Sequence, residues 1–219
     1  MPRAALLLAI ALAAMPAAAT EEPRFETLRQ AGDFELRLYA PMIVAETFVP
    51  GDLSQASGDG FRVIAGYIFG NNVSARGAGA EKVAMTAPVT MEAASEKIAM
   101  TAPVTVEAGA TEGYRMHFVM PSAYTLETLP RPRDDRVRLR AIPAQRVAVI
   151  RFSGFAGEDK VRERTNELLD WVRTEGLDPA GPPRLARYDP PWTLPFLRRN
   201  EVMVPLDRGP RQEGPGEPA

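Results

Sequence analysis

Apolar and polar residues alternate in several short runs of this chain, and this alternation predicts β-strands. The runs lie at residues 34–51, 82–91, 97–106, 114–120, 137–154, about 184–189 and 200–206. The runs at 34–51 and 137–154 are each interrupted once, at Ala40-Pro41 and at Pro143-Ala144, so each predicts two strands. We therefore expect a mainly antiparallel sheet.

Two patterns with helical spacing follow the paired strands. The first comes after Gly51 and comprises Leu53, Ala56, Phe61, Ile64 and Ile68. Gly58 and Gly60 each cost about 1 kcal/mol relative to alanine inside a helix, so the helical pattern is weak in its first half, is stronger from Phe61 onward, and ends at Gly70. The second comes after Gly154, ends at Gly176, and comprises Val161, Leu168, Leu169 and Val172.

The two halves of the chain resemble each other. Residues 34–51 align without a gap on residues 137–154, and identical residues include the leucine-arginine pairs Leu36-Arg37 and Leu139-Arg140. In both halves a helical pattern follows directly. This order predicts an α+β fold in which duplicated strand-helix-strand halves form a distorted antiparallel β-barrel or sheet with two main helices.

A shorter tandem repeat reads EKVAMTAPVTMEA at 81–93 and EKIAMTAPVTVEA at 96–108. Alternation places Met85 and Met100 on apolar strand faces, and it places Thr86 and Thr90 on a face expected to contact water. The proline in each run favours an edge strand or a bulge, and the linker Ala94-Ser95 permits a hairpin. The two methionines are explained either as core residues or as part of an apolar ligand surface, because thioethers are adaptable.

Composition narrows the functional classes. The chain has 219 residues, of which 45% are hydrophobic and 25% charged, as expected for one soluble globular domain. A formal net charge of -2 and the lack of a long basic run argue against nucleic acid as a partner. The absence of cysteine excludes disulfides and cysteine-based catalysis, and a single histidine, His117, leaves no zinc site of the usual kind.

Both ends of the chain differ from the middle. Residues 1–19 have Arg3, an apolar run at 4–14 and the small-residue site Ala17-Ala18-Ala19, which is typical of a signal peptide cleaved before Thr20. A membrane anchor is disfavoured, because spanning a bilayer takes about 20 apolar residues. We expect an exported, periplasmic protein with one domain at 20–206 and a disordered tail at 207–219 that is rich in glycine, proline and charge.

Four strings occur in order over most of the chain: KIAMTAPVT, YRMHFVMPSAYTLETLPRPRDDRVRLR, RVAVIRFSG and YDPPWTLPFLRRNEVMV. Together they resemble the SOUL/heme-binding protein family from about Phe25 to Leu206. The resemblance implies a duplicated β-rich fold with two helices, related to bacterial effector-binding domains. It also implies an apolar surface for heme or another porphyrin, and no established enzymatic activity.

The resemblance places the porphyrin against the first helix, in the segment GFRVIAGYIFG. It implies an apolar wall for the porphyrin that is formed by Phe61, Ile64, Ala65 and Ile68. It also implies that Arg62 would pair with a heme propionate. The alternative explanation is equally good: these four apolar residues would then form the helix face that covers the sheet. His117 is the one candidate axial ligand, but it alternates with apolar residues of its strand. A structural or surface histidine is therefore favoured, with heme held mainly by burial of its faces.

The function expected is that of a heme or porphyrin carrier, buffer or sensor. The alternative is an effector-type module that binds another amphipathic small molecule or a protein partner. An enzymatic function has the least support, because paired carboxylates alone would have to provide the acid and base catalysis. The signatures Tyr188-Asp189-Pro190-Pro191 and Arg198-Arg199-Asn200-Glu201 are interpreted as scaffold, with a rigid turn and charges paired across strand ends.

Overall fold

A computed structural model describes residues 20–77, 79–95 and 112–207. The elements in chain order are β1 (Phe25–Ala31), β2 (Phe34–Tyr39), β3 (Met42–Pro50), α1 (Leu53–Ile68), β4 (Asn72–Val73), β5 (Val89–Ser95), β6 (Glu112–Val119), β7 (Arg131–Pro132), β8 (Arg138–Ile142), β9 (Gln145–Phe152), α2 (Glu158–Thr174), β10 (Arg184–Arg187), the 3₁₀ turn η1 (Pro195–Leu197) and β11 (Asn200–Leu206).

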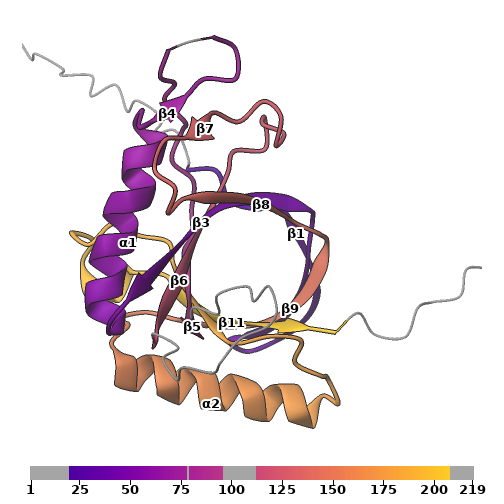
Figure 1. The fold of residues 1–219 in the computed structure, drawn as a ribbon. Coiled ribbons are helices and arrows are strands. Elements are labelled where there is room, and N and C mark those ends of the chain that lie inside the picture. The colour runs from indigo at the N-terminus through magenta and orange to yellow at the C-terminus, as the bar shows by residue number, and fades with distance from the viewer. Residues whose placement is uncertain (1–19, 78, 96–111, 208–219) are drawn as a thin grey trace, which may run out of the picture.

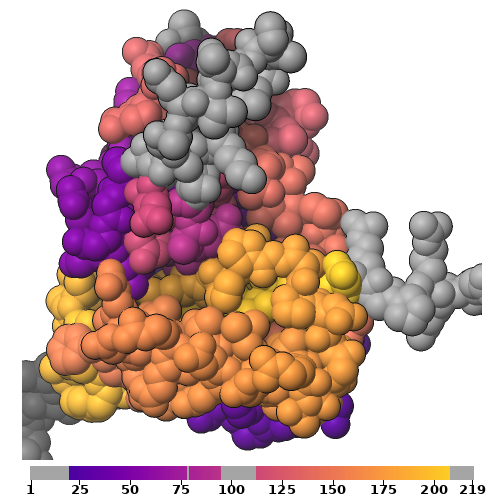
Figure 2. All heavy atoms as spheres, turned by 60° about the horizontal axis from the view of Figure 1, so that its bottom comes forward, coloured from indigo at the N-terminus to yellow at the C-terminus, as the bar shows by residue number. Residues whose placement is uncertain are grey.

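Nine strands form one sheet in the order β1-β2-β9-β11-β10-β5-β6-β3-β8, and every neighbouring pair is antiparallel. The sheet curls into a half-barrel, and both long helices lie on its outside (Figure 1). Helix α2 covers one side of the molecule as a broad layer (Figure 2). The expected α+β class, with a curled antiparallel sheet and two main helices, is confirmed. Among the described residues, no helix is long and apolar enough to cross a membrane.

The main core lies between the outer face of the sheet and the two helices. Because side chains alternate along a strand, every second residue of the central strands joins this core. It includes Ile64 and Tyr67 from α1, Leu168 from α2, Phe118 from β6 and Ile150 from β9. The helical spacing read from the sequence therefore describes the helix faces that cover the sheet.

The inner face of the half-barrel is buried as well. Two smaller apolar clusters lie there, around Tyr39, Val147 and Met203 and around Val44, Val119 and Ile142. Charged and polar side chains are buried on the same face, namely Arg37, Glu46, His117 and Glu201. At these four positions, a polar residue that alternates with core residues is therefore not exposed to solvent.

Helix α1 includes the first half of its sequence pattern, where two glycines lower the helix propensity. It starts at Leu53, where Asp52 caps it by accepting a 2.9 Å hydrogen bond from the backbone amide of Gln55. Gly60 lies in a tight contact, since a Cβ atom there would lie 3.1 Å from Met116 Cε. The weak first half of the pattern is thus helical as well, because tertiary contacts outweigh the low helix propensity of glycine. Helix α2 matches its predicted pattern.

The order strand, strand, helix occurs twice, as β2-β3-α1 and as β8-β9-α2. Gly51 and Gly154 stand just before the helices, with φ of +105° and +95°, a region that favours glycine. These positions were matched in the sequence alignment. The duplication itself stays a prediction.

The tandem repeat is less regular than its alternation predicts. Strand β5 starts at Val89. In the segment before it, backbone hydrogen bonds go to separate parts of the chain; for example, Val83 N donates to Ile68 O at 2.8 Å. β5 also continues through Ala94 and Ser95, so the hairpin expected there is wrong. Thr86 is buried and donates to Val119 O, which contradicts its expected contact with water. The second copy, including Met100, lies outside the described residues.

Candidate functional site

The residues predicted to hold heme on α1 divide into two groups. Ile64 and Ile68 are 1% and 0% exposed and belong to the main core. Phe61 and Arg62 are exposed, and Ala65 is half-buried, so these three line the solvent side of the helix. Met85 is exposed in the segment before β5. Part of the predicted apolar wall is therefore accessible to a ligand, and the rest is buried in the main core. The binding role of these residues stays a prediction.

An exposed apolar surface lies in the connection between β10 and β11 and in the loop before α2. Its five large side chains are 56–81% exposed: Phe155, Trp192, Leu194, Phe196 and Leu197. We call this group the aromatic surface. Contiguous apolar surfaces of this kind mark ligand or partner sites, whereas single exposed apolar residues do not.

The aromatic surface is held in place by hydrogen bonds. Gly154 N donates to Pro195 O at 2.9 Å, and Asn200 Nδ2 donates to Gly154 O at 3.1 Å. Arg198 Nε donates to Thr193 O at 2.8 Å. The loop before α2 and the turn η1 therefore form one unit, which presents its apolar side chains outward.

This unit lies next to the N-terminal half of α1 (Figure 1). Arg187 connects the two, since its guanidinium donates to Ser57 Oγ at 2.8 Å and to Ala156 O at 3.0 Å. Ser57 and Phe61 stand four residues apart, on the same face of α1. The accessible part of the predicted wall thus adjoins the aromatic surface.

Sequence reasoning assigned the Pro-Pro segment to scaffold and missed this surface. The signal was present in Pro191-Trp192-Thr193-Leu194-Pro195-Phe196-Leu197, where large apolar residues alternate with prolines and polar residues. Prolines exclude a central strand, so the apolar residues between them are not buried within a sheet. An exposed apolar loop follows from that pattern.

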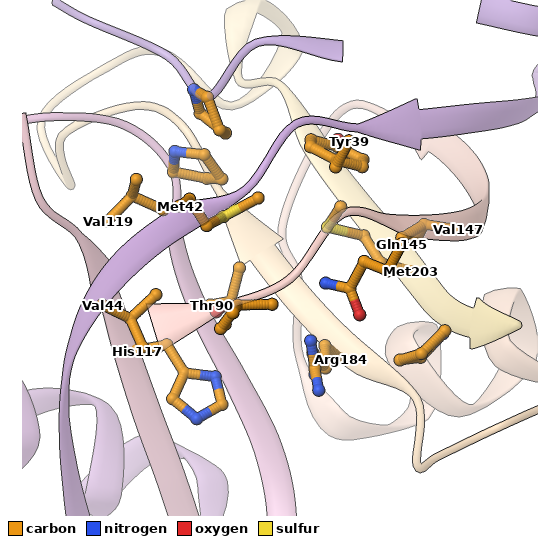
Figure 3. Close-up of a pocket in the computed structure, with 14 residues that line it drawn as sticks. Tyr39, Met42, Val44, Thr90, His117, Val119, Gln145, Val147, Arg184 and Met203 are labelled. Atoms are coloured by element: carbon orange, nitrogen blue, oxygen red, sulfur yellow. The ribbon is translucent and has the colours of Figure 1, made fainter. Parts of the chain in front are cut away.

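A second candidate site lies inside the half-barrel. A small pocket of about 40 Å³ is lined by apolar groups such as Tyr39, Val44 and Met203 and by four polar side chains, Thr90, His117, Gln145 and Arg184 (Figure 3). Four further residues line both this pocket and a wider cleft of about 750 Å³: Pro23, Met42, Val119 and Ile142. The cleft therefore adjoins the pocket, with these four residues between them.

Glu46 is the central acid on the inner face near the pocket. It accepts a 2.9 Å hydrogen bond from Arg140 Nε, and His117 Nε2 lies 3.4 Å from its Oε2. The neighbouring His117 imidazole and Arg140 lower the pKa of Glu46 to about 2 against the opposing effect of burial. Arg184 Nε donates to Glu92 at 2.7 Å. This side of the pocket is thus ordered by ion pairs.

His117 does lie opposite the apolar side chains of its strand, as alternation indicated. It is 2% exposed, however, so it is a buried residue of the inner face and not a surface one. Its Nε2 makes no hydrogen bond within the described residues. The same part of the chain contains no cluster of three or more His, Cys, Asp or Glu that would hold a metal ion. A macrocycle does not fit a 40 Å³ space, so His117 is unsuited to axial ligation in this conformation.

The carboxyl-terminal signatures form part of the scaffold, as interpreted. Tyr188 Oη donates to Glu201 at 2.7 Å, and Arg199 Nε donates to Glu201 at 3.0 Å. Burial raises the pKa of Tyr188, so this hydroxyl stays protonated and serves as a donor. The arrangement fixes the strand ends.

A family model described as SOUL heme-binding protein matches residues 20–205. The chain belongs to the SOUL heme-binding protein family. This family is one of binding proteins and not of enzymes, and its members bind heme or porphyrins. A search of curated protein sequences gives no match.

Solved structures similar to this SOUL protein show the same fold at low identity. The C-terminal domain of EcmrR has a TM-score of 0.56 at 14% identity, with 80% of this chain and 96% of that chain covered. A hydrolase from Listeria innocua has a TM-score of 0.51 at 14% identity, with 82% and 94% covered. An uncharacterized conserved protein from the same organism has a TM-score of 0.52 at 15% identity, with 80% and 92% covered. At these identities the likeness concerns the fold alone.

Proposed function

We propose that this SOUL protein is a heme or porphyrin carrier of the bacterial cell envelope and that it binds the macrocycle at the aromatic surface and the adjoining face of α1. The observation that carries the proposal is the exposure of Phe155, Trp192 and Phe196 beside α1 in a member of a heme-binding family. Export follows from the signal-peptide pattern of residues 1–19.

The residues present suit a flat apolar group with acidic substituents. Trp192 and Phe196 offer aromatic faces for stacking, and Phe61 extends the apolar area onto α1. The exposed Arg62 on the same helix would pair with a propionate. When bound, heme would supply iron chemistry, whereas this chain's own residues bind the ring and orient it.

Burial alone gives useful affinity. A porphyrin that covers a few hundred Å² of apolar surface gains several kcal/mol at roughly 25 cal/mol per Å², which is enough for about micromolar binding after the ordering costs. Without a strong bond to iron the ligand exchanges readily. Exchange of this kind suits a carrier more than an enzyme with a permanent cofactor.

A hemin titration tests the proposal. The purified protein should give a saturable change in the Soret band at micromolar hemin, and Trp192→Ala and Phe196→Ala should each weaken binding about tenfold. Leu28→Ala is the control, because it removes an exposed apolar side chain from the edge strand β1, outside the aromatic surface. No saturable change, or equal loss in all three variants, would refute the assignment.

A further inference from the structure

The inner pocket gathers polar side chains whose hydrogen-bonding capacity is unused. Within the described residues, Thr90, His117 and Gln145 make no side-chain hydrogen bond, and Arg184 uses only Nε. Figure 3 shows these four around one space. Of these groups only His117 Nε2 is fully buried without a partner, whereas Thr90, Gln145 and Arg184 are half-buried. A group that enters the pocket and accepts hydrogen bonds therefore meets several donors at once.

The charge around the pocket favours an anion. Arg115, Arg140 and Arg184 lie on the inner face, where they face the two carboxylates of Glu46 and Glu92. Three arginines face two glutamates there, so these five side chains carry one excess formal positive charge. The ion pairs hold the guanidinium groups in place, and the nitrogens of Arg184 other than Nε make no hydrogen bond within the described residues.

The size of the cavity defines the rest of the ligand. The inner pocket of about 40 Å³ has room for about three water-sized groups, which suits a carboxylate and little more. The outer cleft of about 750 Å³ lies within the range of small-molecule sites and has apolar walls that include Ile43, Met120 and Leu126. Met42, a flexible side chain, lies where the two parts meet.

We propose that this two-part cavity binds a monocarboxylate with a long apolar tail. The carboxylate occupies the inner pocket, where it accepts hydrogen bonds from Arg184, Gln145 and Thr90. The tail lies along the apolar wall of the cleft. This site is separate from the aromatic surface, which lies on the outside of the half-barrel beside α1.

The cleft rim carries acidic residues that this ligand has to pass. Glu22 is paired with Arg199 at 3.0 Å, and Glu21 accepts a 2.9 Å hydrogen bond from Ser122 N. Arg24 also lines the rim, and Glu127 is exposed there. The carboxylate of the ligand is expected to pass these groups and to bind beyond them, so a doubly charged or short acid is disfavoured.

Fluorescence of cis-parinaric acid on binding, compared with its methyl ester, tests the site. The acid should bind with micromolar Kd and the ester at least tenfold more weakly, because the ester has no negative charge. Gln145→Leu and Thr90→Val, which keep side-chain size, should each weaken the acid about fivefold to tenfold and leave the ester unchanged. Thermal unfolding of both variants should match that of the parent protein.

Phe196→Ala is the control that separates the two sites. It should leave parinaric acid binding unchanged while it weakens hemin binding. No saturable binding of the acid, equal affinity for acid and ester, or no effect of either pocket variant would overturn the inference. None of these outcomes alters the hemin result, so the carrier proposal stands or falls separately.

Discussion

Arg37 and Glu201 form a bidentate ion pair across the inner face of the half-barrel. The guanidinium nitrogens lie 2.8 and 3.0 Å from the two carboxylate oxygens, and the side chains are 2% and 0% exposed. Arg37 is on β2 and Glu201 on β11, with β9 between them. The pair therefore joins two strands that share no backbone hydrogen bonds.

Removal of one partner should destabilise the protein strongly. Arg37→Met leaves the Glu201 carboxylate buried without its main partner, and such a loss costs about 3–5 kcal/mol. Urea unfolding measures the change in the free energy of unfolding. The exposed pair of Arg173 and Asp170 gives the control, because Arg173→Met should cost at most about 1 kcal/mol. Similar values for both variants would contradict the structural role of the Arg37–Glu201 pair.

Stability should fall in acid through Glu46. Its pKa is lowered from 4.5 to about 2, so its ionised form stabilises the folded state fully above pH 4.5, and this contribution is lost as the pH falls towards 2. This contribution of Glu46 to the free energy of unfolding is at most about 3 kcal/mol, since a shift of one pKa unit corresponds to roughly 1.4 kcal/mol. Unfolding free energies at pH 7 and pH 3 should differ less in Glu46→Gln than in the parent protein. An unchanged pH dependence in that variant would exclude Glu46 as the group responsible.

Much of the fold follows from the sequence pattern. The strands β6, β10 and β11 and the helix α2 match their predicted runs, because a regular period with turn residues at both ends leaves little choice. The first half of α1 and the segment before β5 show two limits of the sequence pattern. At Gly60 close packing overrides propensity, and around Thr86 single tertiary hydrogen bonds replace a strand ladder.

The candidate sites were harder to predict from the sequence. Alternation correctly placed His117 opposite Met116 and Phe118, but it gave no information on whether that opposite face is open. Closure of the inner face depends on the curl of the whole sheet, which brings distant strands together. Ile64 shows the same limit on α1, since the helical pattern does not distinguish residues that cover the sheet from residues that contact a ligand.

Gly58 and Gly60, two of the three glycines within α1, should respond differently to substitution. No atom lies within 4 Å of a Cβ built at Gly58, so Gly58→Ala should stabilise the protein by up to about 1 kcal/mol through helix propensity. At Gly60 the Cβ would lie 3.1 Å from Met116 and 3.2 Å from Val49, so Gly60→Val should destabilise by about 1–3 kcal/mol. Thermal unfolding of the two variants measures both effects. A stabilised Gly60→Val variant would show that the contact with Met116 adjusts freely.

His117 should be dispensable for heme binding. Its imidazole is enclosed by strands beside Glu46, on the face of the sheet opposite the helices, so the aromatic surface retains all its contacts in His117→Ala. We expect the Soret maximum and the hemin Kd of this variant to equal those of the parent protein. Ile64→Asp is not a suitable comparison, because a carboxylate in the main core should unfold the domain. Phe61→Ala is the better partner, since that side chain is exposed and its loss should weaken hemin binding a few-fold. A shifted Soret band in His117→Ala alone would identify the histidine as an iron ligand and would require the half-barrel to open.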